Sequence, residues 1–200
     1  EIIETLKQKG HHVEAVNFDL LDYMVPCYYV ITTAEASSNL SRYSGILYGY
    51  RSTQATDLES TIKKSRSEGF GEEVKRRIMA GTFVLSSDYY DAYYSKAQKV
   101  RRVIADRTAA LFKDFDIVIN PTTPTTAFEL GGKTADPIAM YLADIFTVQA
   151  PLAGNPALSI PAGTDNSNMP MGIQVMTDLY QEKLMFDFAG YMVNEIINTP

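Results

Sequence analysis

Cysteine and histidine are scarce in this sequence, and their scarcity excludes several kinds of site. Cys27 is the single cysteine among 200 residues, so no disulfide can form within the chain, and this usage suits a reducing compartment. No neighbour in the sequence would activate its thiol, so we interpret Cys27 as a small buried apolar residue rather than a nucleophile. His11 and His12 are the only histidines, adjacent in a solvated turn with no Cys or His at ligand spacing. We therefore expect no metal site and no Ser-His-Asp mechanism.

The chain also has no long apolar run and no excess of positive charge. No run approaches the ~18 residues of a membrane span, and no signal peptide is recognisable. The formal net charge of −6 argues against a surface that binds nucleic acid by itself, although a partner could supply that contact. A length of 200 residues suits a single domain over residues 1–200. Because Glu1 falls within the pattern of a helix, we expect a piece of a longer protein.

Hydrophobic spacing and turn residues predict an α/β fold. A helix over residues 1–9, ended by Gly10 and followed by a strand over 12–20, is a unit typical of this class. Further helices are predicted over 28–40, 56–66, 72–77, 88–115 and 137–148 and near 184–192, and further strands over 116–120, 157–160 and 171–176. The connections are loops at 22–26, 41–54, 121–126 and 150–156, a surface turn at 131–136, and a turn at 164–168 that closes a hairpin.

Two of these elements carry more specific expectations. A capping-box pattern from Thr56 to Glu59 opens the helix over 56–66. The strand over 116–120 is apolar throughout, which suits a strand buried on both faces of a parallel or mixed sheet. The loop over 121–126, PTTPTT, leaves the C-terminal end of that strand, where open α/β sheets bind ligands. Its prolines and hydroxyls could line a polar pocket wall, but such turns also occur without a function.

A pair of adjacent arginines, Arg76 and Arg77, lies in a mostly apolar neighbourhood at the end of the helix predicted over 72–77. A guanidinium binds a carboxylate through two parallel hydrogen bonds, so the pair is a candidate anion site. The alternative is that both arginines are cations in a last helical turn, where they offset the helix dipole. Spacing alone favours the alternative.

Several separate strings, in order and spacing, resemble one known family. They are AEASSNLSRYSGILYGYRS, EGFGEEVKRRIMAGTFVLSSDYYDAYYSKAQKVRR, DIVINPTTPTTAF, DPIAMYLADIFTV and LAGNPALSIPAG, which together extend from about Tyr28 to Met176. The chain resembles the amidase signature family, and within it the branch formed by the A subunits of glutamyl-tRNA(Gln) amidotransferases. The resemblance implies the C-terminal part of the amidase signature fold, with a mixed sheet flanked by helices.

The resemblance also implies that this chain carries no catalytic residue. The nucleophile machinery of the family is a lysine, a serine in a cis peptide and a second serine, set in a Gly/Ser-rich signature in the N-terminal half. No such signature occurs here. The serine pairs Ser37-Ser38 and Ser86-Ser87 lie in helical contexts that match other segments of the family. We therefore expect a portion whose N-terminal catalytic half is absent, and which is inactive by itself.

Three substrate-binding residues are implied by the resemblance. Arg77 matches the residue that binds the α-carboxylate of glutamine, Asp144 matches the residue that binds its α-amino group, and Tyr28 matches a tyrosine that lines the glutamine site. One cation and one anion are sensible anchors for a zwitterionic amino acid. The alternatives are a half-buried aromatic for Tyr28 and, for Asp144, a structural salt bridge, for example with Arg77 itself.

The function implied for the intact protein is hydrolysis of the glutamine side-chain amide through an acyl-serine intermediate. Ammonia would pass to a partner B subunit, where ATP and Mg activate glutamyl-tRNA(Gln), and a small C subunit would complete a cytoplasmic complex. This chain would bind no cofactor and no membrane, and would contact tRNA mainly through the partner subunit. The alternatives are another amidase signature hydrolase and a non-catalytic interaction domain.

Overall fold

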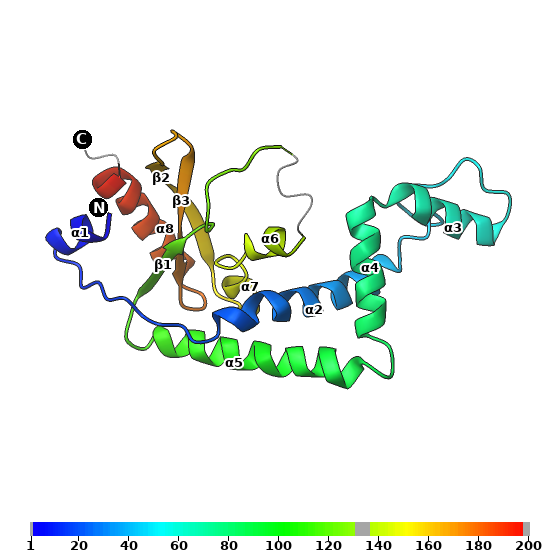
Figure 1. Cartoon of the computed structure of the whole chain (residues 1–200), viewed down its shortest axis with the longest axis horizontal. Helices are drawn as coiled ribbons and strands as arrows, with labels where there is room; N and C mark the ends of the chain where they lie inside the picture. The colour runs from blue at the N-terminus through cyan, green and yellow to red at the C-terminus, as the bar shows by residue number, and fades with distance from the viewer. Residues whose placement is uncertain (1, 131–136, 198–200) are drawn as a thin grey trace. The chain divides into compact units, whose positions relative to one another are not determined.

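The computed structural model describes residues 2–130 and 137–197 (Figure 1). Contacts between Cα atoms divide the chain into two compact units. Unit 1 comprises residues 1–25 and 101–200, and unit 2 comprises residues 26–100. The boundaries fall within helix α2 (Leu21–Leu40) and within helix α5 (Lys96–Leu111). The prediction of one domain over residues 1–200 stays a prediction, because compactness does not measure independent folding.

A three-stranded sheet forms the centre of unit 1. Its strands are β1 (Ile117–Pro121), β2 (Ala157–Thr164) and β3 (Pro170–Thr177), in the order β1-β3-β2. The predicted hairpin of β2 and β3 is confirmed, with Leu158 opposite Val175. The α/β class is also confirmed, but both pairings among the described residues are antiparallel, and the parallel component expected of a mixed sheet is not among them. The prediction that β1 is buried on both faces is wrong, because its residues 117–120 are only half-buried.

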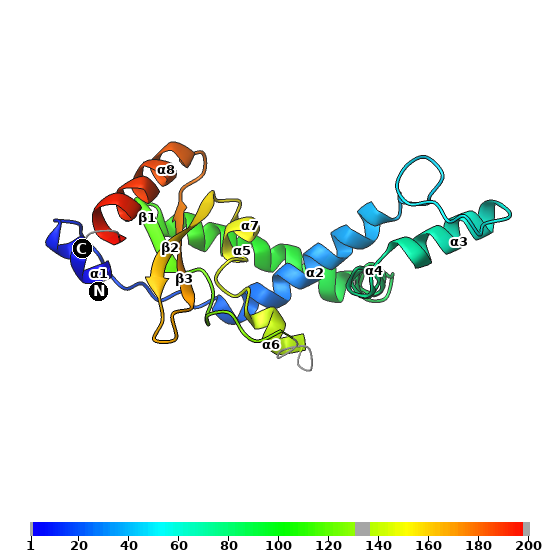
Figure 2. The ribbon, with the colours of Figure 1, turned by 90° about the horizontal axis from the view of Figure 1, so that it is seen from above.

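Helix α8 (Glu182–Tyr191) and the π-helical segment η2 (Met192–Ile197) pack against the sheet and confirm the predicted C-terminal helix (Figures 1 and 2). Val175 of β3 joins Met185 and Met192 in a core cluster that also includes Leu6 of helix α1. Side chains alternate along a strand, so residue 174 points to the opposite face. Gln174 accordingly donates a hydrogen bond to the carbonyl of Phe146 at 2.9 Å. The segment that contains Phe146 therefore contacts the face of β3 opposite this core cluster.

In the N-terminal segment, the predicted helix is confirmed and the predicted strand is wrong. Helix α1 (Ile2–Gln8) ends before Gly10, whose φ of +93° suits a residue without a Cβ. Residues 11–18 have no regular structure, although a strand is expected over 12–20. The apolar alternation there is only partial, and a strand exists only where a neighbour shares its backbone hydrogen bonds. His11 and His12 are exposed, as expected.

The helix predicted over 137–148 is interrupted. Helix α6 (Pro137–Leu142) ends first, residues 143–147 form turns, and helix α7 (Gln149–Ala153) follows within the region expected as a loop. The side chain of Thr147 donates to the carbonyl of Asp144 at 3.0 Å, a local bond that competes with a regular helical ladder. Gly154, at φ +91°, ends α7 in the left-handed conformation. The surface turn predicted at 131–136 lies outside the described residues.

Helix α2 begins earlier than the sequence indicates. The segment 22–26, expected as a loop, forms its first turns with Pro26 inside the helix. Pro26 is the sixth residue of α2, past the four N–H groups that have no partner within a helix, so its missing N–H removes one hydrogen bond of the helix. Cys27 is buried as predicted, and its thiol donates to the carbonyl of Ala97 at 3.3 Å.

The predicted helix pattern after residue 55 is shifted and extended. Helix α3 (Leu58–Gly69) opens with a capping box between Asp57 and Ser60, one residue later than the expected Thr56 and Glu59. Helix α4 (Glu72–Val84) does not end at the arginine pair, so Arg76 and Arg77 lie in its middle and cannot be cations of a last turn. The long helix expected over 88–115 is instead a π-helical segment η1 (Tyr90–Ser95) followed by α5.

Replacing Asp57 by alanine is expected to lower the melting temperature (Tm) at neutral pH, because the N–H of Ser60 loses its acceptor 2.7 Å away. That hydrogen bond, followed by one from the side chain of Ser60 and weaker ones from Thr56 and Glu59, holds the pKa of Asp57 below its ordinary value of 3.8. A depressed folded-state pKa means that the stabilisation is present above the unfolded pKa and is lost as pH falls through the folded one. The Tm difference between wild type and D57A should therefore shrink below pH 3.8. A difference that stays constant into that range would contradict the charge contribution.

Candidate functional site

Arg77, one of the predicted substrate-binding residues, is paired within helix α4. Its Nε donates a hydrogen bond to Oε1 of Glu73 at 3.0 Å, one helical turn earlier. The other oxygen of Glu73, Oε2, accepts from Nη1 of Arg76. The Arg77 side chain is 37% exposed and that of Arg76 is 64% exposed. Arg77 is therefore the better shielded of the two cations, and its charge is partly balanced before any ligand arrives.

Tyrosines of helix α2 lie against Arg77. The Cζ atom of Arg77 is 5.5 Å from the ring centroid of Tyr29, within the range of a cation–π contact. The ring of Tyr29 in turn meets the ring of Tyr28 edge to face, with centroids 5.4 Å apart and planes at 89°. Two residues predicted to bind the ligand, Arg77 and Tyr28, thus belong to one cluster joined through Tyr29.

A glycine allows α2 and α4 to approach closely beside this cluster. A Cβ at Gly81 would lie 2.0 Å from the carbonyl oxygen of Thr33 and 2.7 Å from the Cβ of Ser37. Thr33 is one turn beyond Tyr29, and Gly81 is one turn beyond Arg77. The close approach of the two helix backbones therefore determines the distance between the tyrosine ring and the guanidinium.

Asp144, the third predicted residue, belongs to unit 1 and lies in the turns between α6 and α7. It is half-buried, and its carbonyl accepts hydrogen bonds from the backbone N–H groups of Thr147 at 2.9 Å and Val148 at 3.1 Å. The sequence predicted Asp144 within a helix over 137–148. That prediction is wrong for this residue, which lies in a turn. Because Arg77 belongs to unit 2, the pairing of the two residues around one ligand stays a prediction.

The PTTPTT loop lines a cleft in unit 1. The cleft has a volume of about 620 Å³, and its lining includes Thr123, Pro124 and Thr126 together with residues of β3. Asp165 also lines it and accepts hydrogen bonds from the backbone N–H of Met169 at 2.9 Å and from the Thr126 hydroxyl at 2.9 Å. These bonds hold the pKa of Asp165 below its ordinary value. Asp165 makes the wall anionic at this point, whereas apolar side chains such as Ile3, Met171 and Ile173 line other parts of the cleft.

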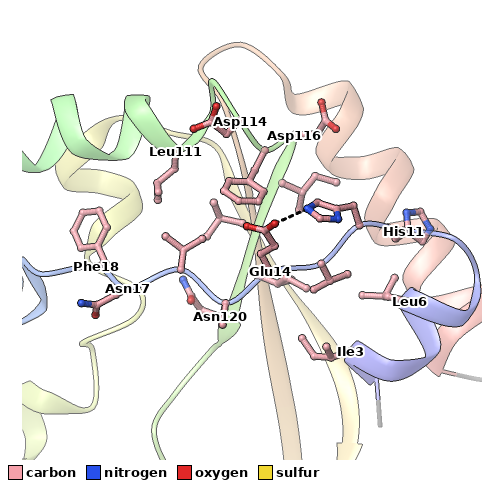
Figure 3. A pocket seen from close by; sticks show the side chains of 18 of the residues that line it. Ile3, Leu6, His11, Glu14, Asn17, Phe18, Leu111, Asp114, Asp116 and Asn120 are labelled. Atoms are coloured by element: carbon pink, nitrogen blue, oxygen red, sulfur yellow. Dashed lines mark hydrogen bonds and ion pairs between the residues drawn. The ribbon is translucent and has the colours of Figure 1, made fainter.

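A second cleft in unit 1, of about 590 Å³, lies between β1 and the N-terminal segment (Figure 3). Apolar residues such as Ile3 and Leu6 line it together with Glu14, to which His12 is hydrogen-bonded at 2.7 Å. His11 instead contacts the hydroxyl of Tyr191 at 3.1 Å. Each histidine has its own partner, and residues 2–130 and 137–197 contain no group of three His, Cys, Asp or Glu that could hold a metal ion.

Two neighbours of Arg77 were not predicted as part of a site. They are Glu73, in the first turn of α4, and Tyr29, in α2. The i, i+4 spacing of Glu73 and Arg77 was the available signal, since such residues face each other on a helix. The contact between Tyr29 and Arg77 joins two helices, and no sequence spacing indicates it.

Comparison with known proteins establishes the class. A family model for amidases matches residues 1–186, so the chain belongs to the amidase family. Among its relatives is the A subunit of glutamyl-tRNA(Gln) amidotransferase from Clostridium botulinum (strain Loch Maree / Type A3), 51% identical over 189 residues, which are 94% of this chain and 39% of the relative. The protein of the same name from Halothermothrix orenii is 50% identical over 196 residues, 98% of this chain and 41% of the relative.

A solved structure gives the same result for the fold. The crystal structure of the A subunit of glutamyl-tRNA(Gln) amidotransferase from Thermotoga maritima matches with a TM-score of 0.71 and 40% sequence identity, over 97% of this chain and 37% of that chain. The chain thus spans about two fifths of the length of these relatives. In the part that the structure describes, no helix has the length and apolar character needed to cross a membrane.

Proposed function

We propose that this chain is a portion of the A subunit of a glutamyl-tRNA(Gln) amidotransferase, an enzyme that converts Glu-tRNA(Gln) to Gln-tRNA(Gln) with ammonia taken from glutamine. The observation that carries the proposal is the 51% identity to such a protein over 94% of the chain. The 40% identity to the solved structure from Thermotoga maritima supports it. The amidase family to which the chain belongs is compatible with hydrolysis of the amide of glutamine.

The role of this portion is glutamine recognition. Arg77 binds the α-carboxylate, Asp144 binds the α-amino group and Tyr28 lines the site, so that the two charged ends of the amino acid are held by opposite charges. The clustering of Arg77 with Tyr28 through Tyr29 supports this assignment. The Lys-Ser-Ser nucleophile machinery lies in chain outside these residues, so the portion by itself performs no hydrolysis.

The partners and cofactors of the proposal follow from the reaction. Ammonia leaves the glutamine site and reaches a B subunit, where ATP and Mg activate the tRNA-bound glutamate, and a small C subunit completes the complex. The net charge of −6 leaves tRNA binding mainly to the B subunit. The complex works in the cytoplasm.

The decisive experiment compares this chain with the full-length protein that contains it. The full-length protein, in complex with B and C subunits, is expected to form Gln-tRNA(Gln) from Glu-tRNA(Gln) with glutamine and ATP, and residues 1–200 alone are expected to release no ammonia from glutamine. Asp-tRNA(Asn) as a second acceptor tests the chemically identical reaction on the other tRNA.

Two results would overturn the proposal. Amide hydrolysis by a full-length protein that does not copurify with a B subunit would show another amidase. Release of ammonia by residues 1–200 alone would show that the nucleophile lies within them.

A further inference from the structure

Glu73 contacts the two arginines of α4 with a different oxygen each. Oε1 accepts from Nε of Arg77 at 3.0 Å, and Oε2 accepts from Arg76. A guanidinium has five N–H donors in a rigid planar fork, so a bond at one donor restricts the direction of all the others. The carboxylate of Glu73 therefore sets the rotation of the Arg77 head group within its plane.

The edge that Glu73 occupies determines how a second carboxylate can bind. Arg77 can bind a carboxylate bidentately through its Nε and Nη2 atoms or through its two Nη atoms. Because Nε donates to Glu73, the pair of Nη atoms is the edge suited to a bidentate ligand carboxylate.

Tyr29 restrains the movement of the Arg77 guanidinium out of its plane. Its ring lies 5.5 Å from Cζ of Arg77, and a cation–π contact restrains a guanidinium from one face. The backbone that carries Tyr29 lies close to α4, because a Cβ at Gly81 would be 2.0 Å from the carbonyl oxygen of Thr33. An in-plane hydrogen bond and a contact from one face together hold Arg77 in one orientation.

We propose that Glu73 is a positioning residue for carboxylate recognition: it holds Nε of Arg77, with Tyr29 against the guanidinium, so that the two Nη atoms bind the α-carboxylate of glutamine. The inference rests on the proposed function, which makes Arg77 the carboxylate-binding residue. It adds that the orientation of Arg77 is set before the substrate binds, which reduces the ordering cost of binding.

Electrostatic repulsion opposes this positioning effect, because Glu73 carries the same charge as the ligand carboxylate. Its repulsion acts at longer range than the hydrogen bond and across a half-exposed surface, where salt and water screen it. The glutamine analogue of Glu73 separates the two effects, since Glu73→Gln keeps an oxygen acceptor for Nε of Arg77 and removes the charge.

The test uses the full-length protein in complex with its partners and measures KM and kcat for glutamine. Glu73→Ala is expected to raise the KM about tenfold, the effect of losing one hydrogen bond to a charged group, with kcat nearly unchanged. Glu73→Gln should bring the KM back to within about twofold of wild type, since the acceptor is restored. The matched control is Glu72→Ala, a neighbouring first-turn glutamate that is paired with Lys75, and it should leave the KM unchanged.

A double mutant separates the possible outcomes. In an Arg77→Ala background, Glu73→Ala should raise the KM no further, because a positioning residue acts through Arg77. If Arg77→Ala raises the KM but Glu73→Ala leaves or lowers it, the positioning role is wrong and the proposed function stands. If Arg77→Ala itself leaves the KM unchanged, Arg77 does not bind the α-carboxylate, and the inference about Glu73 falls with that assignment. Equal increases for Glu73→Ala and Glu72→Ala would show a general effect on the helix and overturn the inference.

Discussion

Replacing Arg77 by alanine in the full-length, assembled amidotransferase is expected to raise the KM for glutamine strongly. Removal of one member of a close charge pair at a binding site typically costs about 2–5 kcal/mol. Arg77 is 37% exposed, and screening at that exposure places the effect near the lower end, about 2–3 kcal/mol or roughly 30- to 150-fold in KM. Arg77→Lys should fall between wild type and alanine, because a lysine keeps the charge and loses the bidentate geometry.

Asp144→Ala is expected to raise the KM in the same way, through loss of the partner for the α-amino group. Steady-state kinetics with glutamine measures both variants, and thermal unfolding shows whether either is merely destabilised. Arg76→Ala is the control, since Arg76 is 64% exposed and shares Glu73 with Arg77. A wild-type KM in both Arg77→Ala and Asp144→Ala would show that these residues do not hold the substrate. A fall in Tm without a change in KM would favour the alternative of a structural ion pair.

Replacing Gly81 by alanine is expected to destabilise unit 2 by about 1–3 kcal/mol or more, the usual cost of overpacking. The added Cβ would lie 2.0 Å from the oxygen and 2.6 Å from the carbon of the Thr33 carbonyl. These are backbone atoms of α2, so no side-chain rotation relieves the clash and the helices must separate. In an exposed helix, replacing glycine by alanine would instead stabilise the protein by about 0.5–1 kcal/mol. The contact between Gly81 and Thr33 therefore turns an expected gain in stability into a loss.

Thermal unfolding checks the effect at Gly81, with a second helical glycine as the control. Gly190 lies in α8, and a Cβ there would meet nothing within 4 Å, so Gly190→Ala should be neutral or stabilising. Separation of α2 from α4 would also loosen Tyr29 from Arg77, and the KM for glutamine of the Gly81 variant should rise. Equal stability of the Gly81 and Gly190 variants would mean that the close approach of α2 and α4 is not required.

Local signals in the sequence predicted several elements well. The turn-forming residues at 164–168, between two segments expected as strands, predicted the β2–β3 hairpin, and Gly10 marked the end of α1. These features depend on contacts between residues close in the chain. The strand expected over 12–20 failed for the opposite reason, since no strand among residues 2–130 and 137–197 pairs with this segment.

The candidate site also combines features that the sequence predicted with features that it did not. Arg77, Asp144 and Tyr28 came from the resemblance to the amidase signature family rather than from spacing, and spacing alone favoured a helix-end role for Arg77. That alternative is wrong, because α4 continues to Val84. The helix predicted around Asp144 is also wrong. The turns at 143–147 depend on local hydrogen bonds, and hydrophobic periodicity does not indicate these.

The sequence by itself determined the family, the α/β class and the identities of the residues proposed to bind glutamine, because these depend on residue types and their order. Only the tertiary structure decided what surrounds Arg77. The carboxylate of Glu73 lies one turn away on the same helix, but the ring of Tyr29 comes from a helix more than forty residues earlier. The two helices meet where Gly81 has no side chain to keep them apart. Packing between distant segments depends on volumes and backbone distances, and these become defined only when the chain has folded.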